Sequence, residues 1–248
     1  MMRVVVFEAP GGLRDDTVGS LARELAVPQT SLGDFMRANL SQRTELGIRV
    51  SEIIDSGALI SDEILTEAVC DGLQGMARTG FLLLGYPHTV SLALALDEVL
   101  RTLDAPLDCV LDLRLPEAEV ERRISSLAAV RRCRNDPRHR FSPATDYLRV
   151  EGACPVCGGE LYQHGNETEV IVSNRFISYE AMLEPLIQHY ARQGLLVTVD
   201  AVGTSDEISG RALAALQEHS GRSLLSWPGR AQHNVTLPQA SSNPADLP

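Results

Sequence analysis

The stretch Arg3-Val4-Val5-Val6-Phe7-Glu8-Ala9-Pro10-Gly11-Gly12 begins with β-branched and aromatic residues and ends in a turn rich in proline and glycine. Such a run predicts a buried strand, and residues 17–25 then show the apolar spacing of a helix. Further strands are predicted at 80–84, 109–115 and 197–202, and further helices at 35–40, 45–57, 62–78, 90–103 and 205–218. Alternating strands and helices of these lengths are typical of an α/β protein with a mostly parallel, doubly wound sheet.

Composition and charge restrict the class of protein. The chain has 248 residues, of which 44% are apolar, and a formal net charge of -11. Apolar runs such as Phe81-Leu82-Leu83-Leu84 are too short to cross a bilayer, so no membrane partner is expected. The acidic balance argues against a nucleic-acid partner, because nothing would neutralise the phosphate charge. The N-terminus carries no signal-peptide pattern, and we therefore expect a cytoplasmic protein.

Arginine supplies all 22 basic residues, because the sequence contains no lysine. Codon bias in a GC-rich genome is the simplest explanation. The chemical consequence is nevertheless definite, because a lysine Schiff base and a phosphate loop with the usual lysine are both excluded.

Two segments depart from the alternating pattern. Residues 131–168 contain three cysteines, two histidines and short β-like pieces, which predicts a small inserted lid. From residue 219 onward the chain is rich in Ser, Pro, Asn, Gln and Ala without periodicity, so 219–248 are expected to form a disordered tail. The main α/β domain is then expected to comprise residues 1–130 and 169–218.

The cysteines of the predicted lid have the spacing of a metal site. Cys133, His139, Cys154 and Cys157 follow the pattern C-x5-H-x14-C-x2-C. Three thiolates and one imidazole suit a closed, tetrahedral structural zinc ion, which would stiffen the lid without taking part in chemistry. Asp136 is an alternative fourth ligand to His139, and a disulfide or unligated thiols are the competing interpretations. Cys70 and Cys109 are expected in the core.

Several motifs together resemble those of one family, the adenylate kinases, over roughly residues 1–218. The resemblance includes the zinc-bearing lid of one bacterial branch of that family. The motifs occur in order along the chain and read Ala9-Pro10-Gly11, Pro28-Gln29-x-Ser31-x-Gly33-Asp34-x-x-Arg37, Glu45-Leu46-Gly47, Gly80-Phe81-Leu82-Leu83-x-Gly85-Tyr86-Pro87 and Cys154-x-x-Cys157-Gly-Gly-Glu-Leu-Tyr-Gln163.

The resemblance implies a P-loop NTPase-like three-layer fold. Its CORE domain would comprise 1–130 and 169–218, with an AMP-binding helical segment at 31–60 and a zinc-binding lid at 131–168 over ATP. It also implies magnesium bound with the nucleotide. The lid arginine that reaches a phosphate stays open, with Arg131 as one candidate. The positions that match nucleotide-binding residues of the family are Gly11, Gly12, Gly33, Asp34, Arg37, Gly85, Arg123 and Arg175.

The chain departs from the family at the phosphate loop. The family reads G-A-P-G-A-G-K-G-T, whereas this chain reads Glu8-Ala9-Pro10-Gly11-Gly12-Leu13-Arg14-Asp15-Asp16. Arg14 stands at the lysine position, and Asp15 and Asp16 make the local charge negative where the family's is positive. Elsewhere Leu84 replaces an aspartate near magnesium, and His88 replaces an arginine that binds the AMP phosphate. These departures predict a degenerate P-loop.

The resulting expectation is an adenylate kinase-like pseudoenzyme, because phosphoryl transfer depends almost entirely on positioning and charge stabilisation. It would bind a nucleotide or a nucleotide-like metabolite, with ATP:AMP phosphotransfer lost or strongly altered, and could act through a protein partner. One alternative is a repurposed enzyme that cleaves or modifies a nucleoside monophosphate-like substrate. Its catalytic candidates are Arg14, Asp15, Asp16 and His88, since carboxylates and imidazoles are general acids and bases. The other alternative is an active nucleoside monophosphate kinase that tolerates Arg14. The oligomeric state is not defined by the sequence.

Overall fold

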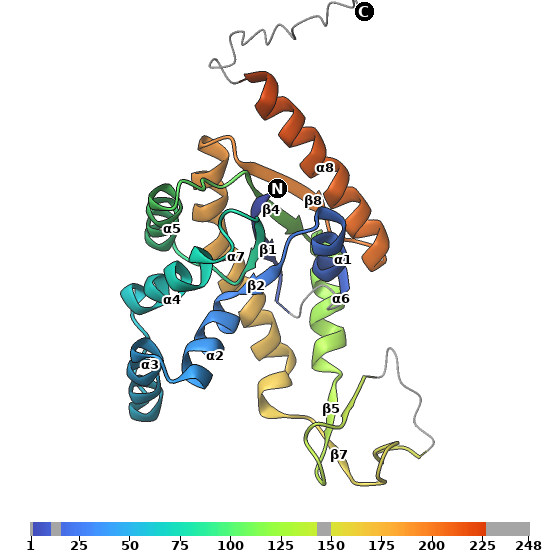
Figure 1. Cartoon of the computed structure of the whole chain (residues 1–248). Coiled ribbons are helices and arrows are strands. Elements are labelled where there is room, and N and C mark those ends of the chain that lie inside the picture. The colour runs from blue at the N-terminus through green and yellow to red at the C-terminus, as the bar shows by residue number, and fades with distance from the viewer. Residues whose placement is uncertain (1, 11–15, 143–149, 227–248) are drawn as a thin grey trace, which may run out of the picture.

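A computed structural model describes residues 2–10, 16–142 and 150–226 (Figure 1). Its central element is a five-stranded sheet of order β2-β3-β1-β4-β8, in which every neighbouring pair is parallel. The expected α/β fold with a parallel sheet is confirmed. The strands are β1 Arg3–Glu8, β2 Gln29–Ser31, β3 Phe81–Leu84, β4 Cys109–Arg114 and β8 Leu196–Asp200.

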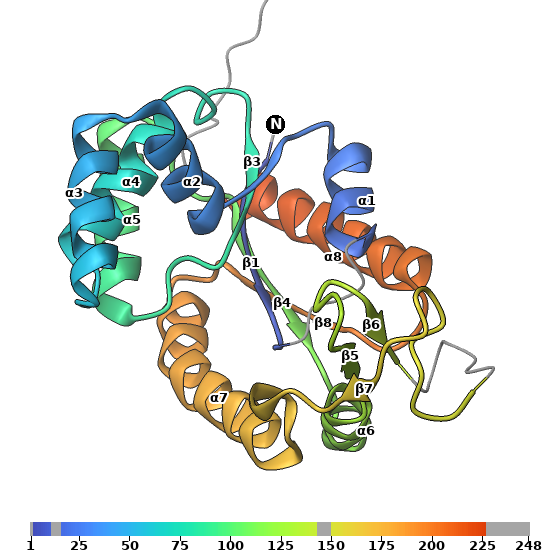
Figure 2. The same cartoon turned by 90° about the horizontal axis from the view of Figure 1, so that it is seen from below.

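Helices cover both faces of this sheet (Figure 2). Val4 and Val6 of β1 pack with residues of α1 and α8, whereas Val5 and Phe7 pack with residues of α3, α4, α5 and α7. Successive side chains of a strand point to opposite faces, so an unbroken apolar run is what a doubly covered parallel sheet requires. The helices are α1 Asp16–Leu25, α2 Leu32–Gln42, α3 Glu45–Ser56, α4 Asp62–Gln74, α5 Val90–Thr102, α6 Glu117–Ala128, α7 Glu169–Arg192 and α8 Ser205–Ser226.

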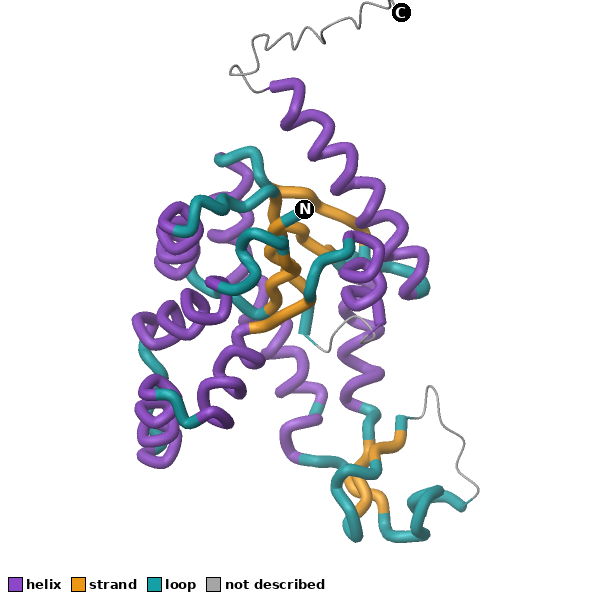
Figure 3. The backbone as a smooth tube through the Cα atoms, in the orientation of Figure 1, coloured by secondary structure: helices purple, strands orange, loops and turns teal. Residues whose placement is uncertain are grey.

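A small second sheet lies beyond the ends of α6 and α7 (Figures 1 and 3). It is antiparallel, with strand order β6-β5-β7. Its strands are β5 Arg131–Cys133, β6 Arg140–Phe141 and β7 Leu161–Tyr162, and a 3₁₀ helix at Gly165–Glu167 leads from it into α7. We refer to residues 131–168 as the lid.

Two features of the helices differ from the sequence-based expectation. The last helix was expected to end at residue 218 but continues to Ser226, so residues 219–226 of the expected tail are helical, while 227–248 lie outside the described residues. The sequence analysis did not single out α6, whose apolar stripe of Val120, Ile124 and Leu127 packs against the core although no residue of the helix is fully buried.

Close packing of α2 against α4 depends on a residue without a side chain. A Cβ atom added at Gly72 of α4 would overlap the ring of Phe35 on α2. Phe35 is itself buried, and α2 also contacts β2 of the main sheet. Gly75, just beyond the end of α4, differs from Gly72: no atom lies within 4 Å of an added Cβ there, and its φ is -78°.

We predict that Gly72→Ala lowers the free energy of unfolding by about 1–3 kcal/mol, because the methyl group overpacks the core. Gly75→Ala is the matched control and should leave stability unchanged or raise it by about 0.4–1 kcal/mol, because its backbone already suits alanine. Urea unfolding of both variants checks this prediction. Equal stability of the two would contradict the described packing.

Candidate functional site

A cavity of about 320 Å³ opens at the carboxyl ends of β1 and β3. Glu8 lines it from the end of β1, and Gly85 and His88 line it from beyond the end of β3. Tyr179 and Met182 line it from α7. Ligands of open α/β sheets bind in the crevice beyond the carboxyl ends of the strands, so this is the first candidate for a binding site.

The segment after β3 has a fixed path that places His88. Gly85 has a φ of +69°, a backbone conformation that favours glycine. The buried Tyr86 follows, and its hydroxyl lies 3.1 Å from the hydroxyl of Thr66 on α4. Thr89 then caps α5 by accepting a hydrogen bond from the N–H of Leu92 at 3.2 Å. His88 is therefore held between a buried ring and a helix cap.

An arginine of β4, paired with a buried aspartate of the same strand, links the sheet to α7 beside this cavity. The side chain of Asp112 on β4 is 1% exposed and accepts a hydrogen bond from Nε of Arg114 at 3.1 Å. Arg114 also donates through Nη1 to Glu180 of α7 at 3.2 Å. Burial raises the pKa of Asp112 and Arg114 opposes that rise. Since Glu180 is next to Tyr179, this bridge fixes the α7 wall of the cavity.

The cavity belongs to a longer cleft that follows α7. A hollow of about 430 Å³ shares Tyr179 and Met182 with it and extends to Arg175. A third hollow, of about 220 Å³, shares Arg175 and reaches Arg140 and Glu167 of the lid. Because neighbouring hollows share lining residues, they form a series along α7 from the carboxyl ends of β1 and β3 to the base of the lid.

The start of α2 brings together three of the predicted nucleotide-binding residues. Ser31 caps the helix by accepting from the N–H of Asp34 at 3.1 Å, and its hydroxyl donates to the Asp34 carboxylate at 2.7 Å. Arg37 donates to the same carboxylate at 2.6 Å. Hydrogen bonds from Ser31 and Arg37 lower the pKa of Asp34. A Cβ added at Gly33 would lie 3.1 Å from the Arg37 guanidinium, which is the end of an exposed side chain.

The other two predicted arginines lie on the helices that join the lid to the sheet. Arg175 of α7 donates to the carbonyl oxygen of Asn166 at 3.0 Å and lines the cleft. Arg123 of α6 donates to Glu119 of the same helix at 3.2 Å. Arg131, the candidate lid arginine, donates to the carbonyl oxygens of Ala128, Ala129 and Val130.

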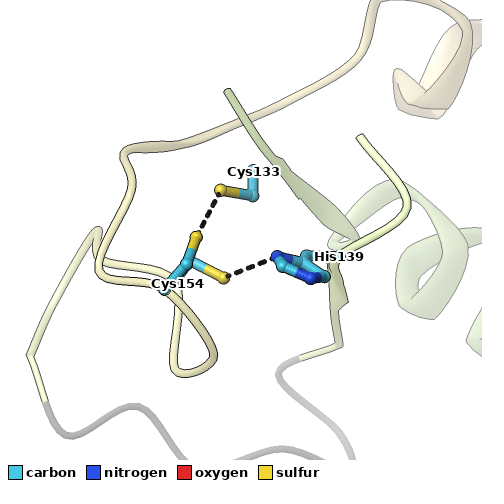
Figure 4. A group of neighbouring side chains, drawn as sticks. Cys133, His139 and Cys154 are labelled. Atoms are coloured by element: carbon cyan, nitrogen blue, oxygen red, sulfur yellow. Dashed lines mark hydrogen bonds between the residues drawn. The ribbon is translucent and has the colours of Figure 1, made fainter. Parts of the chain in front are cut away.

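The predicted metal ligands converge in the lid (Figure 4). The ligand atoms of Cys133, His139, Cys154 and Cys157 all lie within 4.8 Å of one another. The Sγ atoms of Cys133 and Cys157 are 3.4 Å apart, and Sγ of Cys154 is 3.7 Å from Nδ1 of His139. Tetrahedral zinc with bonds of about 2.3 Å to sulfur separates its thiolates by about 3.8 Å. These four side chains could therefore hold a metal ion.

Asp136 lies beside this cluster. Its carboxylate is 3.7 Å from Nε2 of His139, whereas Nδ1 of the same ring faces Cys154. Hydrogen bonds from the Arg138 side chain and backbone strongly lower the pKa of Asp136. The Asp136 carboxylate thus lies on the side of the ring away from the thiols, beyond hydrogen-bond distance, and is bonded to Arg138 instead. His139 is thus the residue that the structure groups with the three thiols.

Four of the predicted site residues, Gly11, Gly12, Arg14 and Asp15, lie outside the described residues. Asp16 is the first residue of α1, and its side chain is outside the described part as well. The expected degenerate P-loop therefore rests on the sequence alone. Sequence reasoning did not identify Arg140 and Glu167 as residues that line the cleft, although Glu167 follows the recognised Gln163 by four residues.

The structure has a parallel sheet with a cleft at its carboxyl edge, arginines along that cleft and a Cys3His lid. These features are consistent with an α/β protein of the P-loop NTPase type. The model of the adenylate kinase family matches residues 6–195. An adenylate kinase of Streptomyces coelicolor is 44% identical over 217 residues, which cover 87% of this chain and 99% of the relative. An adenylate kinase of Methanosarcina barkeri is 34% identical over 218 residues, covering 88% and 99%. The chain belongs to the adenylate kinase family.

These similarities overturn the expectation of a pseudoenzyme. Relatives that are 34–44% identical over most of the chain are named adenylate kinase, which supports an active kinase and also favours it over a repurposed enzyme. The expectation had rested on the combined loss of the loop lysine, the magnesium contacts and a phosphate-binding arginine. Arginine carries the same charge and presents five N–H donors to phosphate oxygens. Among the described helices, none has the length and hydropathy that a membrane span requires.

We predict that the purified protein holds about one tightly bound metal ion per chain and that Cys154→Ser removes it, because a closed site needs all four ligands. Cys70→Ser is the matched control, since Cys70 lies on α4, outside the cluster. Elemental analysis after gel filtration checks the metal content. Equal metal content in the two variants would contradict the assignment of the cluster.

Proposed function

We propose that this protein transfers the terminal phosphoryl group of ATP to AMP and forms two molecules of ADP. The cleft along α7 carries the proposal, because it joins the carboxyl ends of β1 and β3 to the base of the lid. A donor and an acceptor nucleotide need such a continuous path, with positive groups at both ends and a site for transfer between them. The similarity to adenylate kinases supports this assignment.

The acceptor end of the path is assigned to the segment 31–60, with Gly33, Asp34 and Arg37 at the start of α2. Arg37 is 71% exposed and its partner Asp34 is 55% exposed. An exposed ion pair contributes only about 0–1 kcal/mol, so a phosphate can replace the carboxylate without a large penalty. The strand before α2, β2, pairs with β3, and Gly85 and His88 after β3 line the 320 Å³ cavity.

The donor end is assigned to the lid at 131–168, with Arg123 and Arg175 on the helices of the CORE domain (1–130 and 169–218). Gly11, Gly12 and Arg14 would follow Pro10, which lines both the 320 Å³ and the 220 Å³ cavities. Arg14 supplies the positive charge that a lysine gives elsewhere. In this proposal its planar donor group binds phosphate oxygens.

Magnesium, when bound with the nucleotide, neutralises charge that develops on the transferred phosphoryl group. Glu8 is the described carboxylate best placed for it, since it lines the central cavity and magnesium prefers oxygen ligands. Asp15 and Asp16 are further oxygen donors in the same stretch of sequence. Glu8 would hold the ion or one of its waters.

Zinc is the metal proposed for Cys133, His139, Cys154 and Cys157. Three thiolates and an imidazole suit zinc, and a set of four protein ligands leaves no open position for chemistry. The proposed role is structural: the ion holds the strands of the lid in register. His139 is followed directly by Arg140, so the same ion would fix the start of β6.

We predict that Arg37→Ala raises the KM for AMP by at least about tenfold, because a hydrogen bond from a charged donor contributes about 1.5–3 kcal/mol. The KM for ATP should stay within twofold. Arg101→Ala is the matched control, since Arg101 is an equally exposed arginine, paired with Glu98 three residues before it on α5, outside the segment 31–60. Steady-state rates with each nucleotide varied in turn give both constants. An unchanged KM for AMP in Arg37→Ala would remove α2 from the acceptor site.

A further inference from the structure

One sulfur of the Cys3His cluster is open to solvent. Cys133 has no exposed surface and Cys154 is 4% exposed, whereas Cys157 is exposed. Its neighbour Val156 is 71% exposed, so this turn of the chain lies on the surface of the lid. Because an oxidant attacks a thiolate that it can reach, Cys157 is the member of the cluster most open to oxidation.

The exposed sulfur has a buried partner at short range. Sγ of Cys133 lies 3.4 Å from Sγ of Cys157. A disulfide bond is about 2.0 Å long, so a small approach of these two side chains would join them. The remaining two members face each other, with Sγ of Cys154 3.7 Å from Nδ1 of His139. The cluster therefore consists of a thiol pair and a thiol–imidazole pair.

The backbone holds the turn that carries Cys157 against Cys133. A Cβ atom added at Gly159 would lie 2.8 Å from Sγ of Cys133, so glycine lets the chain approach this sulfur closely. Two hydrogen bonds close the turn: the N–H of Cys154 donates to the carbonyl oxygen of Gly159 at 2.7 Å, and the N–H of Gly158 donates to that of Cys154 at 2.8 Å. The two thiols are thus kept within reach of each other.

We propose that Cys157 is an oxidation site and that Cys133 converts its oxidised form into a disulfide bond. A peroxide transfers one oxygen atom to the Cys157 thiolate, which gives a sulfenic acid and, from hydrogen peroxide, one hydroxide ion. The Cys133 thiolate then attacks the sulfenic sulfur, so that the S–S bond forms and a second hydroxide ion leaves. Two protons convert these ions to water, and the two thiolates have given two electrons to the peroxide.

The disulfide bond would also empty the proposed zinc site. Metal ligation requires the thiolate form of cysteine, and the disulfide takes two of the four ligands away, so the ion is released. The strands of the lid then lose the ion proposed to hold them in register. This consequence rests on the proposed function, whereas the disulfide itself needs only the two thiols. A thiol reductant restores both thiolates by exchange.

The test is treatment of the purified full chain with hydrogen peroxide, followed by two measurements that need no turnover. Peptide mass spectrometry should find Cys133 linked to Cys157, and a chromogenic chelator should detect release of about one zinc ion per chain. Dithiothreitol followed by added zinc should reverse both changes. Cys70→Ser is the matched control, since Cys70 lies on α4 outside the cluster, and it should behave as the wild type does.

Two variants assign the roles of the two cysteines. Cys133→Ser should accumulate a sulfenic acid on Cys157 that a dimedone probe labels, because its partner thiol is missing. Cys157→Ser should consume peroxide at least about tenfold more slowly than the wild type, because the remaining cluster thiols are buried.

Three results would overturn the proposal: a Cys154–Cys157 disulfide in the oxidised wild type, oxidation of Cys157 to a sulfinic acid without a disulfide, or wild-type rates in Cys157→Ser. Failure of the zinc assignment is distinguishable from these. A wild-type protein that holds no metal but forms the Cys133–Cys157 disulfide would remove the zinc proposal and leave the oxidation site standing.

Discussion

A guanidinium paired with a carboxylate is the interaction on which each part of this site depends. Without lysine, the chain meets every requirement for positive charge with arginine. At the start of α2, Arg37 forms an ion pair with Asp34. Arg114 forms ion pairs with Asp112 and Glu180, and Glu167 forms them with Arg132 and Arg140. The planar guanidinium matches a carboxylate and a phosphate equally well, so an exposed pair of this kind marks a place where a phosphate could take the carboxylate's position.

Burial separates these pairs into two kinds. The Asp112 side chain is 1% exposed, and removing its partner would leave an uncompensated buried charge, so Arg114 is part of the framework that fixes α7. The pair of Arg37 and Asp34 is largely exposed and contributes little to stability. A phosphate can therefore replace the carboxylate at an exposed pair at little cost. A pair with a buried carboxylate instead holds the neighbouring elements in place. Arg140, which is half-exposed but bound to a buried carboxylate, combines both properties.

Local sequence patterns predicted most of the fold. The strand at the N-terminus, the strand before Gly85 and the Cys3His cluster all follow from short runs of residues, because strand burial and ligand spacing are local properties. The pairing of Arg132 with Arg140 was not predictable in this way, since it depends on the register of two strands separated by a turn. Glu167 accepts hydrogen bonds from both arginines at a buried position, and its place in the sequence does not predict these contacts. The helical extension to Ser226 has no periodic signal in a segment rich in polar residues.

The combined replacements in the phosphate loop and at Leu84 and His88 led the sequence-based interpretation to a pseudoenzyme, which the similarity to adenylate kinases contradicts. The central claim is that a chain without lysine nevertheless transfers a phosphoryl group from ATP to AMP. Phosphorus NMR of the full-length protein with ATP, AMP and magnesium tests it most directly. The account predicts that the ATP and AMP signals decline together while two ADP form for each pair consumed. Unchanged AMP, with ATP either intact or hydrolysed to free phosphate, would contradict it.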